Sequence, residues 1–201
     1  SRLTDPYDDP ESNYIDPGDW DKMSRFAKAI RTANNTLAGR LLIGPLLGTA
    51  CFLRSDWRNR RADPRVLRGW AWHIPALTAV IVWLSTVATI PFWAYGLAAY
   101  GGLSLLKIRT FLEHQAHVKA RGRTVIIDDQ GPLALLFLNN NYHVLHHIHP
   151  RIPWYRLPRL FRKNPGRYLS QNDGYFYRSY REVFAKHFLA PKDPVPHPIW
   201  R

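Results

Sequence analysis

The chain has 201 residues, a formal net charge of +13 and a single cysteine, Cys51. One cysteine excludes an intrachain disulfide framework and a zinc site built from cysteines. The charge is unevenly distributed, because residues 1–21 carry seven acidic residues and one basic residue, whereas residues 22–201 carry 27 basic and eight acidic residues. Such a basic surplus is typical of a protein that binds nucleic acid, anionic lipid or an acidic protein.

The first third of the chain is predicted to lie outside long apolar helices. Residues 1–35 form an acidic lead-in that ends in a surface helix over residues 21–35. Residues 36–68 form an interfacial or re-entrant segment and a basic loop, because the apolar run 37–53 contains a charged residue and several helix breakers. These are Arg40, Gly39, Gly44, Pro45 and Gly48.

A stretch of 38 residues, 69–106, contains no Asp, Glu, Lys or Arg. As one helix it would be about 57 Å long, whereas the hydrocarbon core of a bilayer is about 30 Å thick. Because Pro91 disfavours a helical conformation at the preceding residue, we predict a turn over residues 86–91. We therefore expect a transmembrane hairpin over residues 69–118, whose second helix continues to about Ala120. A buried hairpin of a soluble protein is the alternative.

Basic residues flank both ends of the predicted hairpin, as expected for cytoplasmic flanks. They are Arg54, Arg58, Arg60, Arg61, Arg65 and Arg68 before it, and Lys107, Arg109, Lys119, Arg121 and Arg123 after it. We therefore expect an all-α, multi-pass integral membrane protein, for example of a bacterial inner membrane. Residues 119–201 are expected to form a helical cap on its cytoplasmic side, with a turn or short hairpin over residues 124–132 and a single helix over residues 133–149.

The most informative motif is His143-x-x-His146-His147. If this segment is helical, the three side chains share one face within a single turn. Adjacent imidazoles suit iron, copper, nickel or zinc, so we predict a metal site. Three asparagines precede the motif at 139–141; one is expected to cap the helix, and one to hydrogen-bond an imidazole, with Asn140 as the candidate.

A second histidine group, Glu113-His114-x-x-His117, lies where the hairpin helix is expected to leave the membrane. His114 and His117 share a helical face, and we predict His114 as a metal ligand and His117 as a weaker candidate. Glu113 is interpreted as a ligand, as a hydrogen-bond acceptor for an imidazole N–H, or as a surface carboxylate. The other histidines are placed outside the ligand set: His73 between helices, His149 beside the site or in solvent, and His187 and His197 at the surface.

Two segments, FLEHQAH at 111–117 and NNNYHVLHHIHPRIPWYRLP at 139–158, resemble the carboxy-terminal half of the membrane fatty acid desaturases. The wider relatives of that family are the membrane di-iron hydroxylases. The resemblance extends over roughly residues 3–162. Members of the family contain three histidine boxes, and the first two precede the acidic segment, whereas the first histidine of this chain is His73. We therefore expect a carboxy-terminal piece of a longer enzyme, inactive by itself.

The resemblance implies a function for the complete protein. The three histidines of the 143–147 motif bind iron, and His114 corresponds to a further ligand at the end of a transmembrane helix. The complete protein holds two iron ions and uses O₂ to remove two hydrogens from a lipid acyl chain, with no catalytic side chain beyond the ligands. Two alternatives remain: a related di-iron hydroxylase, which uses the same ligands, and a non-catalytic membrane protein that binds one zinc ion or no metal.

Basic residues cluster again after the second segment: Arg151, Arg156, Arg159, Arg162, Lys163 and Arg167. They are interpreted as a docking surface for an acidic electron donor of the ferredoxin or cytochrome type. Attraction to anionic lipid headgroups is the alternative. A nucleic-acid partner is disfavoured, because no known binding motif is present and a charge-free stretch of 38 residues has no place in such a domain.

Overall fold

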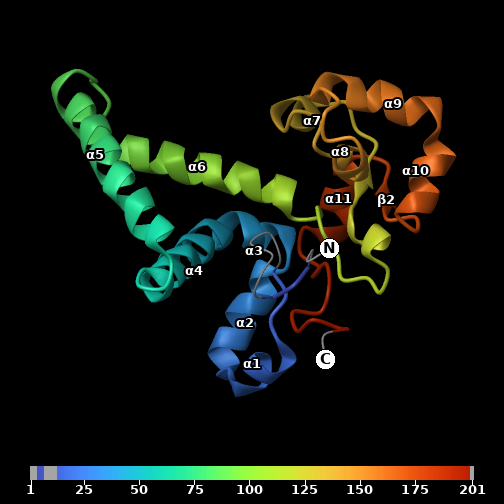
Figure 1. Cartoon of the computed structure of the whole chain (residues 1–201), viewed down its shortest axis with the longest axis horizontal. Coiled ribbons are helices and arrows are strands. Elements are labelled where there is room, and N and C mark those ends of the chain that lie inside the picture. Colours follow the sequence, from blue (N-terminus) through green and yellow to red (C-terminus); the bar gives the residue numbers. More distant parts are fainter. Residues whose placement is uncertain (1–3, 7–12, 200–201) are drawn as a thin grey trace. The chain divides into compact units, whose positions relative to one another are not determined.

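The computed structural model describes residues 4–6 and 13–199, and these are mostly helical (Figure 1). The chain divides into two compact units. Unit 1 comprises residues 1–42 and 105–201, and unit 2 comprises residues 43–104. The four segments predicted from the sequence, with boundaries at residues 35, 68 and 118, remain a prediction.

Unit 1 consists of short helices and two short strands. The predicted surface helix over residues 21–35 is observed as α2, which begins after Ser24, whose hydroxyl accepts a hydrogen bond from the Ala27 N–H. The elements of unit 1 are α1 (Pro17–Lys22), α2 (Arg25–Asn34), α3 (Leu37–Leu42), the 3-10 turn η1 (Ala120–Arg123), β1 (Ile126–Ile127), α7 (Pro132–Leu136), α8 (His143–Ile148), the 3-10 turn η2 (Trp154–Arg156), α9 (Leu157–Lys163), α10 (Pro165–Gln171), β2 (Phe176–Tyr177) and α11 (Tyr180–His187).

Strand β1 lies between two hydrophobic clusters that form the core of unit 1. Val125 and Ile127 belong to one cluster together with Phe111, whereas Ile126 belongs to the other together with Tyr142. This division follows from the strand geometry, in which successive side chains point to opposite faces. Residues 125–127 are therefore anchored from both sides.

The two strands correct the all-α prediction. β1 pairs with β2 in parallel, with Ile126 opposite Phe176 and Ile127 opposite Tyr177. The short hairpin predicted as one alternative over residues 124–132 is therefore wrong, whereas the other alternative, a turn, agrees with the hydrogen bond from the N–H of Asp129 to the carbonyl of Ile127. The partner strand of β1 is β2, which lies between α10 and α11 in the sequence, so no pattern near β1 indicates the pairing.

Two helix predictions also require correction. The helix expected to run to about Ala120 is α6 (Phe92–Thr110), which ends before the first histidine of the second group. The chain is then extended, because the backbone of residues 113–115 bonds to residues 123–125. The single helix expected over residues 133–149 is two helices, α7 and α8, because Leu138 and Asn139 both have a φ of 52° and reverse the chain.

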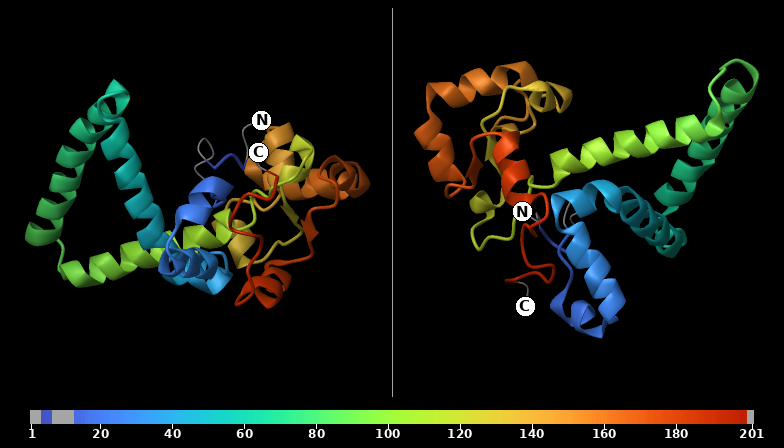
Figure 2. Two further views of the ribbon diagram at one scale, coloured as in Figure 1. Left: turned by 90° about the horizontal axis from the view of Figure 1, so that it is seen from below. Right: turned by 180° about the vertical axis from the view of Figure 1, so that it is seen from behind.

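Unit 2 contains α4 (Gly44–Asn59), α5 (Pro64–Thr86) and most of α6. The predicted turn near Pro91 is confirmed, since α5 and α6 flank it (Figure 2). Many large apolar side chains of these two helices are exposed. They are Leu67, Trp72, Ile74, Leu77, Val80, Ile81, Val82, Trp83, Phe92, Trp93, Tyr95, Leu97 and Leu103.

The predicted transmembrane hairpin is not supported. Over residues 4–6 and 13–199, none of the helices combines the length and the apolar character needed to cross a membrane. Aromatic, polar and helix-breaking residues interrupt the charge-free stretch: Trp72, His73 and Pro75 in α5, and Gly96, Gly101 and Gly102 in α6.

The surface position predicted for His197 is wrong. Its residue is 5% exposed, and its ring packs edge-on against Tyr14 with the ring centroids 4.9 Å apart. We expect His197→Ala to lower the free energy of unfolding by about 1–3 kcal/mol, since it removes buried contacts. Urea denaturation measures this, with Arg181→Ala, which alters an exposed side chain, as the control. Equal midpoints for wild type and His197→Ala would contradict the assignment.

The effect of His197→Ala on stability should also depend on pH. Burial is the main cause of a His197 pKa below its ordinary value. The unfolded chain therefore binds the proton more readily than the folded chain, and the contribution of the neutral imidazole is lost as the pH falls below about 6.5. We expect the difference between wild type and His197→Ala to narrow from pH 7.5 to pH 5.5. A constant difference over that interval would contradict this.

Candidate metal centre

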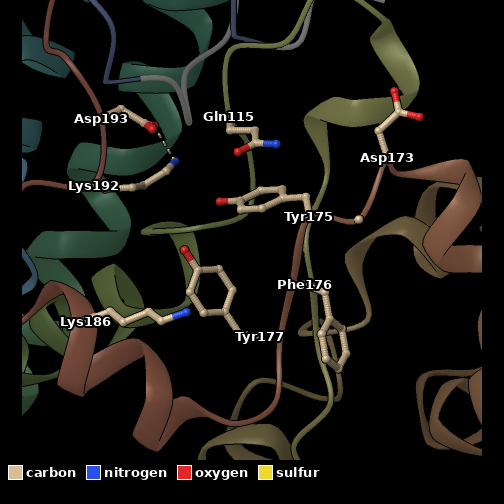
Figure 3. Close-up of a pocket in the computed structure, with 9 residues that line it drawn as sticks. Gln115, Asp173, Tyr175, Phe176, Tyr177, Lys186, Lys192 and Asp193 are labelled. Carbon is tan, nitrogen blue, oxygen red and sulfur yellow. Dashed lines mark ion pairs between the residues drawn. The ribbon is translucent and has the colours of Figure 1, made fainter.

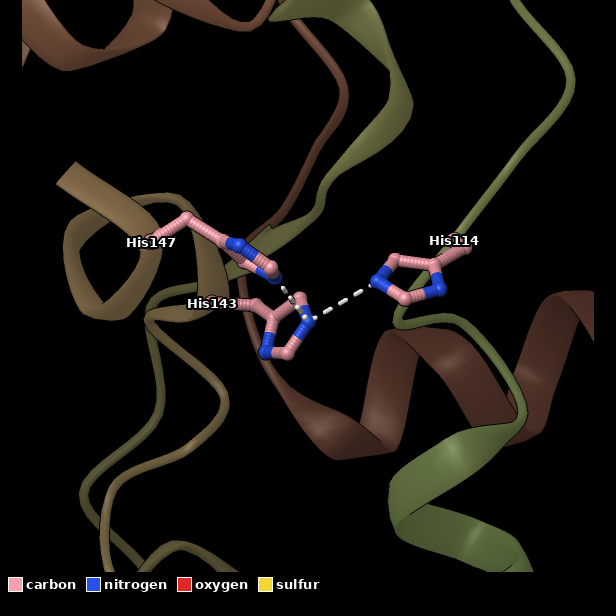
Figure 4. Close-up of side chains that lie close together, drawn as sticks. All are labelled: His114, His143 and His147. Atoms are coloured by element: carbon pink, nitrogen blue, oxygen red, sulfur yellow. Dashed lines mark hydrogen bonds between the residues drawn. The ribbon is translucent and has the colours of Figure 1, made fainter. Parts of the chain in front are cut away.

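Three imidazoles from two distant segments converge in unit 1 (Figure 4). His114 comes from the extended segment after α6, and His143 and His147 come from α8. The Nε2 atom of His143 lies 3.1 Å from Nε2 of His114 and 3.0 Å from Nε2 of His147. One ring nitrogen from each histidine lies within 4.8 Å of the other two. The two histidines that are four residues apart on α8 thus lie next to His114, as the sequence predicted.

Backbone hydrogen bonds to Val125 explain why these segments meet. The N–H of Val125 donates to the carbonyl oxygen of Glu113 at 3.3 Å, and its carbonyl oxygen accepts from the N–H of Val144 at 3.3 Å. Glu113 precedes His114 and Val144 follows His143, so one residue, Val125, fixes the neighbours of both ligand candidates. The two histidines themselves are 29 positions apart in the sequence.

The cluster is chemically suited to a metal ion. His143 is 5% exposed, and burial, followed by the neighbouring imidazoles, holds its pKa well below the ordinary value. The imidazole is therefore neutral at pH 7 and retains a lone pair on one ring nitrogen. With metal–nitrogen bonds of about 2.0–2.1 Å, neighbouring ligand nitrogens lie roughly 3.0–3.4 Å apart. The observed separations from His143 fit that range, so the three donors fit an imidazole-binding transition metal.

A hydrogen-bonded chain lies behind His143. Arg109 forms an ion pair with Glu113 at 3.0 Å, as expected for residues four apart near the end of a helix. The Glu113 carboxylate, in a residue only 2% exposed, accepts a hydrogen bond from the amide nitrogen of Asn140. The Oδ1 atom of Asn140 lies 3.4 Å from Nδ1 of His143. A proton on Nδ1 directs the lone pair of Nε2 toward the other two histidines.

The neighbouring asparagines have different partners. Asn141 donates to the backbone carbonyls of Ile127 and Asp129 at 2.7 and 3.0 Å, which holds the loop before α8. Asn139 donates to the carbonyl of Trp154 at 3.3 Å. The helix α8 has no side-chain cap among the described contacts, since Tyr142 stands at that position. The expected asparagine cap is therefore wrong, whereas Asn140 does reach an imidazole.

The remaining sequence candidates lie beside or away from the three-histidine group. His146 is exposed, and its ring centroid is 6.1 Å from that of His143 and 5.9 Å from that of His147. His117 instead accepts a hydrogen bond from the Lys119 N–H and lies 3.9 Å from Asp173. The others have partners elsewhere: His149 contacts Tyr168, His73 packs against Trp70, and the partly buried His187 contacts Tyr177.

Sequence reasoning missed two residues that contact the site. Arg109 could have been paired with Glu113 from their spacing of four on a predicted helix. Lys192 donates to the backbone carbonyl of His114 from 78 positions away. No local pattern in the sequence identifies that second contact.

We expect the chain, once stripped of metal by a chelator, to bind one Co²⁺ ion per molecule through nitrogen ligands. His114→Ala, His143→Ala and His147→Ala should each weaken binding by at least about tenfold, because each removes a ligand. Competition with a chromophoric chelator measures the affinity. His73→Ala, a histidine variant in unit 2, is the matched control, and equal losses in all four variants would refute the cluster as the binding site.

Asn140→Ala should weaken Co²⁺ binding by about 10–100-fold, the usual effect of removing a hydrogen bond that orients a ligand. The physical reason is the lost restraint on Nδ1 of His143. Asn139→Ala is the control, because the side-chain hydrogen bond described for Asn139 goes to the backbone carbonyl of Trp154 and not to a histidine. Indistinguishable affinities for the two variants would show that Asn140 does not orient His143.

Comparison with known proteins gives a single positive finding. The family model described as fatty acid desaturase matches residues 1–179, a range that includes every member of the three-histidine group. Searches of curated proteins and of solved structures gave no match. Since the family model covers most of the sequence, the chain belongs to the fatty acid desaturase family.

Proposed function

We propose that His114, His143 and His147 bind iron in an enzyme that introduces a double bond into lipid acyl chains with O₂ as co-substrate. The convergence of these three imidazoles, in a chain of the fatty acid desaturase family, carries the proposal. His146, on the same turn as His143 and His147, is proposed as a fourth ligand. Three or four imidazoles suffice for one ion, so a di-iron centre would need further donors.

The choice of metal follows from the reaction. When bound, iron supplies a redox-active ion that can react with O₂, whereas zinc has no accessible change of oxidation state. Acid–base groups alone cannot remove hydrogen from an unactivated carbon. Accordingly, no catalytic side chain is proposed beyond the ligands.

The residues around the ligands have positioning and shielding roles. Asn140 holds the imidazole of His143 in one orientation, Glu113 accepts a hydrogen bond from Asn140, and Arg109 pairs with the Glu113 carboxylate. His114 and His143 are buried, whereas His147 is exposed. The exposed side of His147 is therefore the proposed approach for O₂ and the acyl chain.

The proposed substrate environment is lipid. Family membership implies an acyl substrate, and the exposed apolar side chains of α5 and α6 are the kind of surface that marks membrane interaction. We propose that this surface of unit 2 contacts the bilayer. This proposal requires contact with lipid and does not require either helix to cross the membrane.

The reaction also requires an electron donor. O₂ takes up four electrons on conversion to two water molecules, and the acyl chain gives two, so a partner supplies the other two. The basic residues after α8 are exposed in the structure: Arg151, Arg156, Arg159, Arg162, Lys163 and Arg167. We propose that they dock an acidic donor of the ferredoxin or cytochrome type. Anionic headgroups are the competing partner.

The test is metal and product analysis of the longest open reading frame that contains this chain. The purified protein, supplied with Fe²⁺, a reductant and an acyl lipid, is expected to retain iron and to form an unsaturated product only when O₂ is present. Mass spectrometry identifies the product. His143→Ala should lose both iron and product, whereas His73→Ala should keep both.

Other products would give different answers. A hydroxylated acyl chain would assign the protein to the related hydroxylases. Retention of one zinc ion without O₂ consumption would support a non-catalytic protein. Turnover that persists in His143→Ala would remove the basis of the proposal.

A further inference from the structure

We infer that the C-terminal strap, defined as residues 188–199, positions His114 for metal binding through Lys192. The inference rests on the proposed metal site and extends it, since it concerns residues beyond the part of the chain that the family model matches, 1–179. Lys192 acts on the backbone of His114, so it is a positioning residue.

Residues 113–116 have two backbone edges, and different partners bond to each. On one edge, His114 and Thr124 form an antiparallel bridge. There the N–H of Gln115 donates to the carbonyl of Arg123, and the N–H of Val125 donates to the carbonyl of Glu113. In an extended strand, the carbonyl of His114 and the N–H of Ala116 then point to the opposite edge. That second edge needs donors and acceptors from elsewhere.

Lys192 and Tyr14 satisfy the second edge. The ammonium group of Lys192 donates to the carbonyl oxygen of His114, and the hydroxyl of Tyr14 accepts from the N–H of Ala116 at 2.8 Å. Asp193 connects these two side chains, because it forms an ion pair with Lys192 at 3.3 Å and accepts a hydrogen bond from the Tyr14 hydroxyl. The ligand segment is therefore held from both sides.

The fold fixes the position of the Lys192 side chain. That side chain is only 8% exposed, so the charge depends on Asp193 and on the His114 carbonyl for stabilisation. Backbone bonds fix the strap: Lys192 donates to the carbonyl of Asn35, and the N–H of Ile15 donates to the carbonyl of Val195. A lysine placed this way restricts the backbone of His114, and with it the direction of the imidazole.

A polar cavity of about 350 Å³ beside Lys192 suggests a ligand site as a competing interpretation (Figure 3). Its polar side chains already have protein partners. Tyr175 donates to the carbonyl of Leu112 at 2.7 Å, and Lys186 pairs with Glu182 at 2.6 Å. Lys192 itself bonds to His114 and Asp193, so the arrangement favours a positioning role.

The experiment compares Co²⁺ affinity and stability in two strap variants of the whole chain. Lys192→Met removes the donor to His114 and should lower Co²⁺ affinity by at least about tenfold. Val195→Ala removes a buried apolar side chain of the same strap, which lowers the urea midpoint but leaves the donor in place. Its Co²⁺ affinity should stay within about threefold of wild type.

A double variant separates the effect of the lost Lys192 donor from the effect of the unpaired charge on Asp193. Lys192→Met alone leaves the partly buried carboxylate of Asp193 without its cation. Lys192→Met combined with Asp193→Asn removes that charge and keeps an acceptor for the Tyr14 hydroxyl. Affinity should remain low in the double variant, because the donor to His114 is still absent, and recovery to the wild-type value would overturn the inference.

The remaining outcomes distinguish the two proposals. Wild-type affinity in Lys192→Met would overturn the role of the strap, as would equal affinity losses in Lys192→Met and Val195→Ala. If wild type binds Co²⁺ and His143→Ala does not, the metal site stands in either case. If wild-type protein binds no Co²⁺ at the histidines, both the metal site and the strap inference fail.

Discussion

The two backbone hydrogen bonds of one residue, Val125, bring the two halves of the candidate site together. Its N–H bonds to Glu113 and its carbonyl bonds to Val144, so the residues beside His114 and His143 are fixed to the same short strand. Two hydrophobic clusters hold that strand from opposite faces, with Val125 and Ile127 in one and Ile126 in the other. The ligand geometry is thus set by the packed core of unit 1, which is how a preorganised metal site is normally supported.

The sequence predicted which histidines lie together better than it predicted the backbone around them. The spacing of His143 and His147 on a helix was sufficient to place two imidazoles together, and the pairing of this helix with His114 was also expected. The continuation of α6 past Thr110 was wrong, because residues 113–115 bond to residues 123–125, and such tertiary pairing has no local signature. The reach of Lys192 to His114 is non-local in the same sense.

Two other predictions depended on composition. Pro91 predicted the nearby turn correctly, whereas the absence of charge over residues 69–106 predicted membrane-spanning helices, and none of the helices within residues 4–6 and 13–199 has the length and apolar character for that. His197 was expected at the surface because it lies in a C-terminal tail that was interpreted as polar. It is buried because the C-terminal strap crosses Tyr14 and places its ring there. Local sequence patterns therefore predicted secondary-structure elements, whereas tertiary contacts determined which residues are buried.

The central claim is that His114 joins His143 and His147 around one ion. X-ray absorption spectroscopy of the Zn²⁺-loaded chain measures it directly, because imidazole ligands give a characteristic scattering pattern with metal–nitrogen distances of about 2.0–2.1 Å. We expect at least three imidazoles in the wild-type spectrum and one fewer in His114→Ala. Identical spectra for the two proteins, or a wild-type spectrum without imidazole scattering, would contradict the claim.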